Sequence, residues 1–130
     1  MIKIDGGVTA AQGFKAAGVR CGIKQKGLDL AVIYSESECS AAGVFTTNAF
    51  KAASIIINTE RLQSGRARAV VVNSGNANAC TGKRGVQDAL HICDYAGGLL
   101  GINPNEVLNA STGIIGVPLP MDKIEAGVKE

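Results

Sequence analysis

A strand-like segment that leads into a long amphipathic helix constrains this sequence more than any other feature. Residues 66–74, RARAVVVNS, carry a run of β-branched side chains that is typical of a β-strand. Residues 85–101 predict a helix that ends at Gly101, with one apolar face made of Val86, Ala89, Leu90, Cys93, Ala96, Gly97 and Leu100. A helix with one apolar face needs a layer to cover, so the pair predicts a helix packed on a sheet.

The other segments predict further strands and shorter helices. Strands are expected over residues 14–24, 28–36, 41–48, 53–59 and 107–111. One or two helical turns are expected over 59–65, with Thr59 as cap and Gly65 as stop. Residues 103–106, Asn-Pro-Asn-Glu, predict a capped helical turn, and residues 121–130 begin another helix. Because most strands precede the helices, the order favours a layered α+β fold over a doubly wound sheet.

Length and composition narrow the class of protein. The 130 residues fit one domain, and 46% hydrophobic residues argue against disorder. The sequence stops inside a helical pattern, so residues 1–130 are expected to be a partial, truncated domain. A net charge of +2 with no Trp argues against nucleic-acid binding and against an anionic membrane surface. Without an apolar run of about 18 residues or a secretory signal, a cytoplasmic protein is expected.

The four cysteines and the single histidine do not predict a metal site. Cys21, Cys39, Cys80 and Cys93 lack the C-x-x-C spacing of zinc and redox sites. Reduced thiols that pack as small hydrophobic groups are expected instead. His91 lies within the predicted helix, which favours a surface role over a Ser-His-Asp triad or a Cys80–His91 pair.

A loop rich in small residues connects the predicted strand to the long helix. Its window Ala77 to Arg84, ANACTGKR, approaches the phosphate-loop pattern, with Lys83 as counter-charge. Arg84 stands where that pattern needs a Ser or Thr for magnesium, so a tight turn with a solvated Lys-Arg pair is the competing interpretation. A nucleotide-binding module and a non-catalytic scaffold remain alternative functions.

A second segment of small residues, Asn109 to Gly113, ends the predicted strand over 107–111. Two strands that end in this way are expected to converge on one pocket. The hydroxyl of Thr112 and the backbone N–H of Gly113 are the kinds of donor that an oxyanion hole uses in acyl transfer. The carboxylates show no paired spacing, so the residues alone predict donors without a nucleophile.

Four longer phrases resemble the ornithine acetyltransferase family, also called the glutamate N-acetyltransferases of arginine biosynthesis. They are GGVTAAQGFKAAGV (6–19), AAGVFTTNAFKAA (41–53), RARAVVVNSGNANACTG (66–82) and NASTGIIGVPLPMDKI (109–124). The resemblance implies a layered α+β fold of the N-terminal-nucleophile type, in a precursor that cleaves itself into α and β chains. It implies that the new N-terminal Thr of the β chain takes an acetyl group from N-acetylornithine and passes it to glutamate.

The same resemblance implies roles, substrates and partners. Thr112 and Gly113 would stabilise the oxyanion, and an α2β2 heterotetramer is expected. No metal and no bound cofactor are expected, with acetyl-CoA as a substrate of some members. We expect Asn73, Asn76 and Asn78 to orient the Thr112–Gly113 turn, with a purely structural turn as the alternative. The chain stops before the family's catalytic Thr, so it is expected to be inactive alone.

Overall fold

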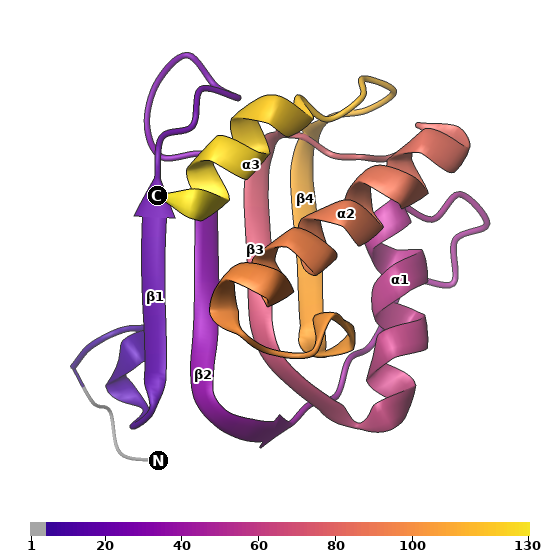
Figure 1. The fold of residues 1–130 in the computed structure, drawn as a ribbon. Helices are drawn as coiled ribbons and strands as arrows, with labels where there is room; N and C mark the ends of the chain where they lie inside the picture. Colours follow the sequence, from indigo (N-terminus) through magenta and orange to yellow (C-terminus); the bar gives the residue numbers. More distant parts are fainter. Residues whose placement is uncertain (1–4) are drawn as a thin grey trace.

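The computed structural model describes residues 5–130 and contains one four-stranded sheet whose strands follow one another in chain order (Figure 1). The strands are β1 (Phe14–Val19), β2 (Leu30–Ser40), β3 (Arg66–Asn76) and β4 (Val107–Ile114). The pairs β1–β2 and β2–β3 are antiparallel, whereas β3 and β4 are parallel. A parallel pair needs a crossover connection, and the long helix between β3 and β4 provides it.

The helices pack on one face of this sheet and at its β4 edge, which confirms the layered α+β fold (Figure 1). They are α1 (Ala53–Arg61), α2 (Gly82–Leu100) and α3 (Met121–Lys129), with 3₁₀ turns η1 (Val8–Ala10), η2 (Leu62–Ser64) and η3 (Pro104–Glu106). The strand predicted over 66–74 is confirmed and extends to Asn76, and the helix predicted over 85–101 begins three residues earlier. In η3 the Asn103 side chain accepts from the Asn105 N–H at 3.0 Å, as the capping pattern predicts.

Two predicted strands are wrong. Residues 53–59 lie in α1, because burial of Ala53, Ser54, Ile57 and Arg61 follows helical spacing and packing outweighs the β preference of three isoleucines. Thr59 therefore lies inside the helix rather than at a cap, and its hydroxyl donates to the Ile55 carbonyl at 2.7 Å. Residues 41–48 form a loop without strand pairing. Gly65 does end the helical turns, with φ +69°.

The bounds of the other strands differ from the prediction for identifiable reasons. β1 ends at Val19 because the buried Asp29 carboxylate accepts the backbone N–H groups of Cys21, Gly22 and Lys24, which curls the chain into a loop. β2 continues past an irregularity between Tyr34 and Cys39 to end at Ser40. Residues 109–113, expected as a turn, lie within β4.

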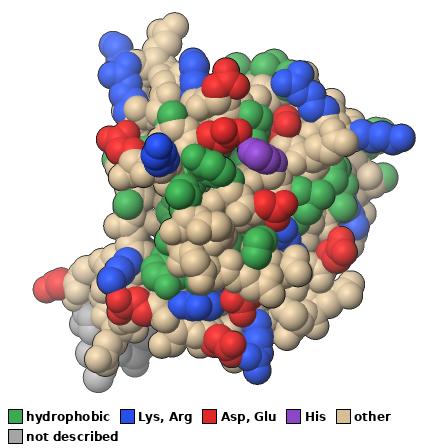
Figure 2. Space-filling model, viewed as in Figure 1, with side chains coloured by type: hydrophobic (Ala, Val, Ile, Leu, Met, Phe, Trp, Pro, Cys, Tyr) green, Lys and Arg blue, Asp and Glu red, His purple; other side chains and the backbone are tan. Residues whose placement is uncertain are grey.

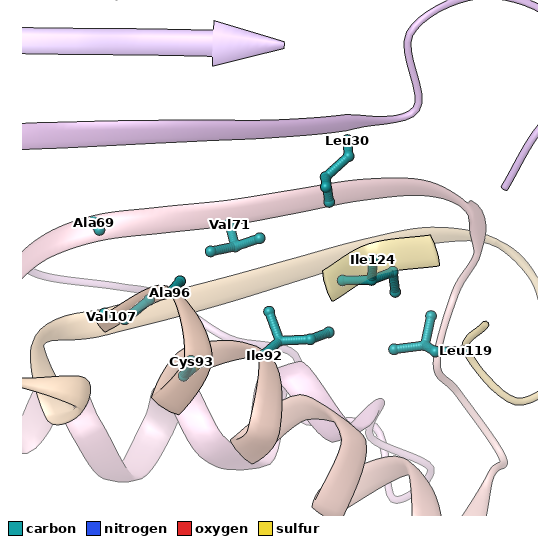
Figure 3. Packing of buried hydrophobic residues seen from close by; sticks show 9 residues of the cluster. All are labelled: Leu30, Ala69, Val71, Ile92, Cys93, Ala96, Val107, Leu119 and Ile124. Carbon is teal, nitrogen blue, oxygen red and sulfur yellow. The ribbon is translucent and has the colours of Figure 1, made fainter. Parts of the chain in front are cut away.

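The core lies between the sheet and helices α2 and α3 (Figure 3). Its buried side chains come from alternate strand positions and from one face of each helix: Leu30, Ala69, Val71, Ile92, Cys93, Ala96, Val107, Leu119 and Ile124. On α2 the predicted apolar face is partly wrong, since Leu90 is 40% exposed and Ile92 is buried instead. Cys93 packs as a small hydrophobic residue as expected, whereas Cys80 is exposed.

The opposite face of the sheet carries a second set of small and apolar side chains. We call it the open face and define it by Ala31, Ile33, Val70, Val72, Leu108, Ala110 and Thr112, which are register partners or alternate along their strands. Most of them are only half-buried. On the helix-covered side, acidic and basic side chains are interspersed rather than gathered by sign (Figure 2). None of the helices within residues 5–130 is long and apolar enough to cross a membrane.

Candidate active site

The two segments of small residues lie side by side at one edge of the sheet. Because β3 and β4 are parallel, their carboxyl ends emerge together, at the top of Figure 1. The register pairs Ser74 with Thr112 and Gly75 with Gly113. The two strand ends therefore lie side by side, as the prediction of a shared pocket requires.

Glycines allow the two strand ends to approach closely. Gly113 has φ +134°, and a Cβ atom there would lie 2.2 Å from the carbonyl carbon and oxygen of Gly75. Gly75 has φ +123°, and a Cβ atom there would lie 2.4 Å from a methyl of Ile23. Side chains are thus excluded at both positions by conformation and by space. The backbone of Gly113 keeps a fixed place against the neighbouring strand.

Thr112 and Gly113 are exposed, and the expected shared cavity does not enclose them. By strand alternation Thr112 belongs to the open face, beside Ser74. One cavity of about 430 Å³ lies among β1, β2 and the ends of α2 and α3. Another, of about 320 Å³, lies at the start of α2. Neither cavity is lined by Thr112 or Gly113, so the described residues present the two donors on a surface beside the Asn/Gly-rich loop.

Two of the three asparagines contact the segment that contains Thr112. Asn73 accepts a hydrogen bond from the Ser111 hydroxyl at 2.6 Å. Asn76 donates to the Pro118 carbonyl at 2.9 Å and to the Val117 carbonyl at 3.4 Å. Backbone bonds add to these contacts, because the Ala77 N–H donates to Ile114 and the Gly116 N–H donates to Ala79. The loops that follow β3 and β4 are joined along their length.

Asn78 has a different place from the one we expected. Its side chain is fully buried and donates to the Gly85 carbonyl at 2.8 Å, and the Thr81 hydroxyl donates to its Oδ1 at 2.8 Å. Its carbonyl accepts the Ala53 N–H at 3.2 Å. Asn78 therefore joins the starts of α1 and α2, and none of its hydrogen bonds within residues 5–130 reaches β4.

The loop that resembles a phosphate loop has the form of a tight strand-to-helix turn. Asn78 (φ +48°) and Cys80 (φ +57°) adopt left-handed backbone conformations, and Gly82 begins α2. Arg84 lies 3.7 Å from the Asp88 carboxylate, one helical turn away. Burial raises the pKa of Asp88, while the Arg84 and His91 charges act to lower it. Within residues 5–130 no three His, Cys, Asp or Glu side chains are grouped so as to hold a metal ion.

Helix α1 supports the edge of the sheet at β4, a feature that the sequence analysis missed. The Asn58 carboxamide donates to the Asn109 carbonyl at 2.8 Å and accepts the Asn109 N–H at 3.2 Å. The Arg61 guanidinium, which is nearly buried, donates to the carbonyls of Val107 and Pro104. These side chains take the place of a fifth strand beside β4. The spacing of Asn58 and Arg61, three residues apart on one face of a helix, could have indicated this role. The three neighbouring isoleucines favoured a strand prediction for the segment instead.

His91 and Cys80 do not form a catalytic pair. His91 is exposed on α2, with its Nε2 2.8 Å from Glu125 Oε1 on α3 and its ring stacked beside Tyr95. It therefore has the surface role predicted from the sequence. Cys80 lines the smaller cavity together with Lys51 and Lys83.

Known protein families include one that matches most of this chain. The ArgJ family model matches residues 15–130. The chain belongs to the ArgJ family. The glycine pair and the small-residue strand ends both lie within the matched residues.

Curated members of the family resemble the chain over nearly its whole length. The arginine biosynthesis bifunctional protein ArgJ of Gloeobacter violaceus is 53% identical over 128 residues, which cover 97% of this chain and 32% of that protein. The ArgJ protein of Caldanaerobacter subterraneus is 48% identical over 126 residues, covering 97% of this chain and 31% of that protein. The chain therefore spans about a third of the length of these relatives.

Solved structures show the same fold. The ArgJ crystal structure from Bacillus halodurans superposes with a TM-score of 0.93 at 42% identity, covering 96% of this chain and 66% of that one. Ornithine acetyltransferase from Mycobacterium tuberculosis, solved in complex with ornithine, superposes with a TM-score of 0.92 at 47% identity. That likeness covers 95% of this chain and 67% of the other.

Proposed function

We propose that residues 1–130 are part of the α chain of an acetyltransferase of arginine biosynthesis and supply its oxyanion-binding groups. The reaction would move an acetyl group from N-acetylornithine to glutamate. The observation that carries the proposal is the joined end of β3 and β4, where Thr112 and Gly113 lie against Ser74 and Gly75 in an ArgJ fold. These strand ends offer a hydroxyl and backbone N–H groups close together.

The chemistry explains why such groups are needed. Attack on an acetyl carbonyl turns its oxygen into an oxyanion, and hydrogen-bond donors that are already in place stabilise that charge. Removing one such donor raises the barrier by about 3 to 4 kcal/mol. The Thr112 hydroxyl and the Gly113 N–H would be these donors. Gly113 is confined by the Gly75 backbone, so its N–H would need little reorganisation during the reaction.

The remaining parts of the catalyst would come from a partner chain. We infer that the N-terminal Thr of a β chain from the same precursor is the nucleophile, activated by its own amine. Thr112 belongs to the open face, so the β chain would approach from that side and cover its half-buried apolar residues. Two such αβ pairs would form an α2β2 enzyme. Residues 1–130 alone would be inactive, because the proposed nucleophile belongs to the β chain.

The proposed reaction needs no resident metal or cofactor, because the acetyl group passes from a substrate to the Thr hydroxyl and then to an amine. Acetyl-CoA would serve as an alternative donor if the assembled enzyme has both activities. Assays that offer N-acetylornithine or acetyl-CoA as the only donor, with glutamate as acceptor, separate the two cases.

A chimeric enzyme tests the proposal directly. Residues 1–130 replace the corresponding part of the Gloeobacter violaceus protein, with which they share 53% identity over 128 residues. We expect the chimera to transfer acetyl from N-acetylornithine to glutamate, and Thr112→Ala to lower kcat roughly 100- to 1,000-fold. Thr59→Ala, an exposed threonine on α1, is the matched control and should leave kcat unchanged. Wild-type kcat in the Thr112→Ala chimera would remove the oxyanion assignment.

A further inference from the structure

The carboxamide of Asn73 joins the ends of β3 and β4 from the helix-covered side. Its side chain is 3% exposed, and its Nδ2 donates to the Asn76 carbonyl at 3.0 Å. A carbonyl oxygen can only accept, so this contact fixes which end of the carboxamide is the donor. Oδ1 then faces Ser111, whose hydroxyl must donate the 2.6 Å bond. One buried side chain thus holds a residue of each strand end.

Through Ser111, the Asn73 hydrogen bond fixes the orientation of the two candidate donors, Thr112 and Gly113. Ser111 directly precedes Thr112, and neighbouring side chains of a strand point to opposite faces. Holding Ser111 toward Asn73 therefore holds Thr112 toward the open face. Asn76 follows Gly75, whose backbone confines Gly113. A rotation of β4 about its own axis would break the Ser111 bond and move both donors together.

An asparagine is not the residue that packing alone would favour at position 73. The preceding positions on the same side of β3 are Ala69 and Val71, and the register partner of Asn73 on β2 is the buried Leu30. Burying a carboxamide costs free energy unless its polar atoms are hydrogen-bonded. An apolar side chain would avoid that desolvation cost but would leave the Ser111 hydroxyl and the Asn76 carbonyl without this partner. What the carboxamide adds is a directional link between the two strands.

We propose that Asn73 is a positioning residue for acetyl transfer, acting through Ser111 on the Thr112 hydroxyl and the Gly113 N–H. The inference rests on the proposed function, because it assumes that these two donors meet the oxyanion. Asn73 itself would touch neither substrate nor nucleophile. Its loss would leave both donors in place but misdirected in the transition state.

The chimeric enzyme described above provides the test, with kcat and KM measured separately. Asn73→Ala and Ser111→Ala should each lower kcat roughly 10- to 100-fold, since small misplacements of catalytic groups have costs of that size. KM for N-acetylornithine should change less than threefold, because the donors act mainly on the transition state. The double variant should be no slower than the slower single variant, since both changes break one link. Ser111→Thr, which keeps a hydroxyl, should retain most of kcat.

A buried asparagine elsewhere provides the structural control. Asn78 is also fully buried and hydrogen-bonded, but its contacts lie at the starts of α1 and α2. Asn78→Ala should lower the melting temperature while kcat of the folded fraction stays at the wild-type level. Wild-type kcat in Ser111→Ala, or equal losses of kcat in Ser111→Ala and Ser111→Thr, would overturn the proposal. The Ser111 variants change only a small side chain and should fold, so they test the positioning role even if Asn73→Ala does not fold.

The result also separates this inference from the proposed function. If Thr112→Ala is slow but Asn73→Ala and Ser111→Ala match the wild type, only the positioning role fails. If Thr112→Ala keeps full kcat, the oxyanion assignment fails and the positioning role fails with it. In the Thr112→Ala background, Asn73→Ala should lower kcat by much less than in the wild type.

Discussion

Replacing Asn58 by Ala tests whether helix α1 completes the edge of the sheet. Asn58 exchanges two hydrogen bonds with the backbone of Asn109, at 2.8 Å and 3.2 Å, as a neighbouring strand would. Asn109 is 1% exposed, so water cannot replace the lost partners without local opening. The substitution therefore leaves a buried N–H and a buried carbonyl unpaired. We expect β4 to open more readily just before Thr112.

The size of the effect follows from these contacts. An unpaired buried polar group costs roughly 1 to 3 kcal/mol, so two of them cost about 2 to 4 kcal/mol after partial relaxation. Ala favours the helix over Asn by roughly 0.5 kcal/mol, which offsets part of the loss. A net destabilisation of about 1.5 to 3.5 kcal/mol remains. That free energy corresponds to a loss of roughly 10- to 300-fold in hydrogen-exchange protection.

Amide hydrogen exchange of the segment 107–111 in the chimeric enzyme measures this loss locally. Thr59→Ala is the control, because Thr59 is the next residue on α1, is exposed, and bonds only within its own helix at 2.7 Å. Its effect on exchange of 107–111 should correspond to less than about 0.5 kcal/mol. If Asn58→Ala leaves the exchange of this segment as it is in the control, the Asn58 pairing does not hold β4. The reasoning would then be refuted.

Two further predictions concern titratable groups. Burial acts to raise the pKa of Asp29, but the N–H groups of Lys24 and Cys21 outweigh it and bring the pKa to about 2, below the ordinary 3.8. Because this pKa is lower in the folded protein, ionised Asp29 stabilises the fold above pH 3.8, and this stabilisation is lost as the pH falls toward 2. The difference in the free energy of unfolding between wild type and Asp29→Asn, measured by urea titration, should therefore become smaller over this pH range. A difference that does not depend on pH would contradict the prediction. Burial raises the pKa of the Cys93 thiol to about 11, whereas Cys80 is exposed, so a maleimide at pH 7 should modify Cys80 well before Cys93. Mass spectrometry of the labelled peptides checks this order, and equal labelling of the folded protein would refute it.

The strand and helix with the strongest local patterns could be predicted from the sequence. The β-branched run over Val70–Val72 and the apolar spacing of α2 agree with their tertiary surroundings, so both elements form where expected. The local preference of the three isoleucines at 55–57 does not agree with their tertiary surroundings. Their local preference favours a strand, but Ile57 and Arg61 pack as one face of a helix. Packing decided that segment, whereas residues 41–48, also predicted as a strand, form a loop without strand pairing.

The candidate site was only partly predictable for a related reason. Thr112 and Gly113 were identified from the motif, and their nearness to the Asn/Gly-rich loop was expected from two similar strand ends. The hydrogen-bond partners of the three asparagines could not be told apart from the sequence, because Asn73, Asn76 and Asn78 lie in one short segment. In the structure, Asn73 and Asn76 form hydrogen bonds with β4 and the loop that follows it, whereas Asn78 forms hydrogen bonds at the starts of α1 and α2.

The central strand–helix unit, the layered class of the fold and the phrases that mark the family could all be predicted from the amino-acid sequence. These properties depend on neighbours along the chain, where side-chain spacing and backbone preference act directly. Three contacts came from the folded chain instead: Ser74 lies beside Thr112, Gly113 is held against Gly75, and Asn58 pairs with the outer edge of β4. Such contacts join residues far apart in the chain, and a shift of one residue in strand register would abolish them without changing any local pattern.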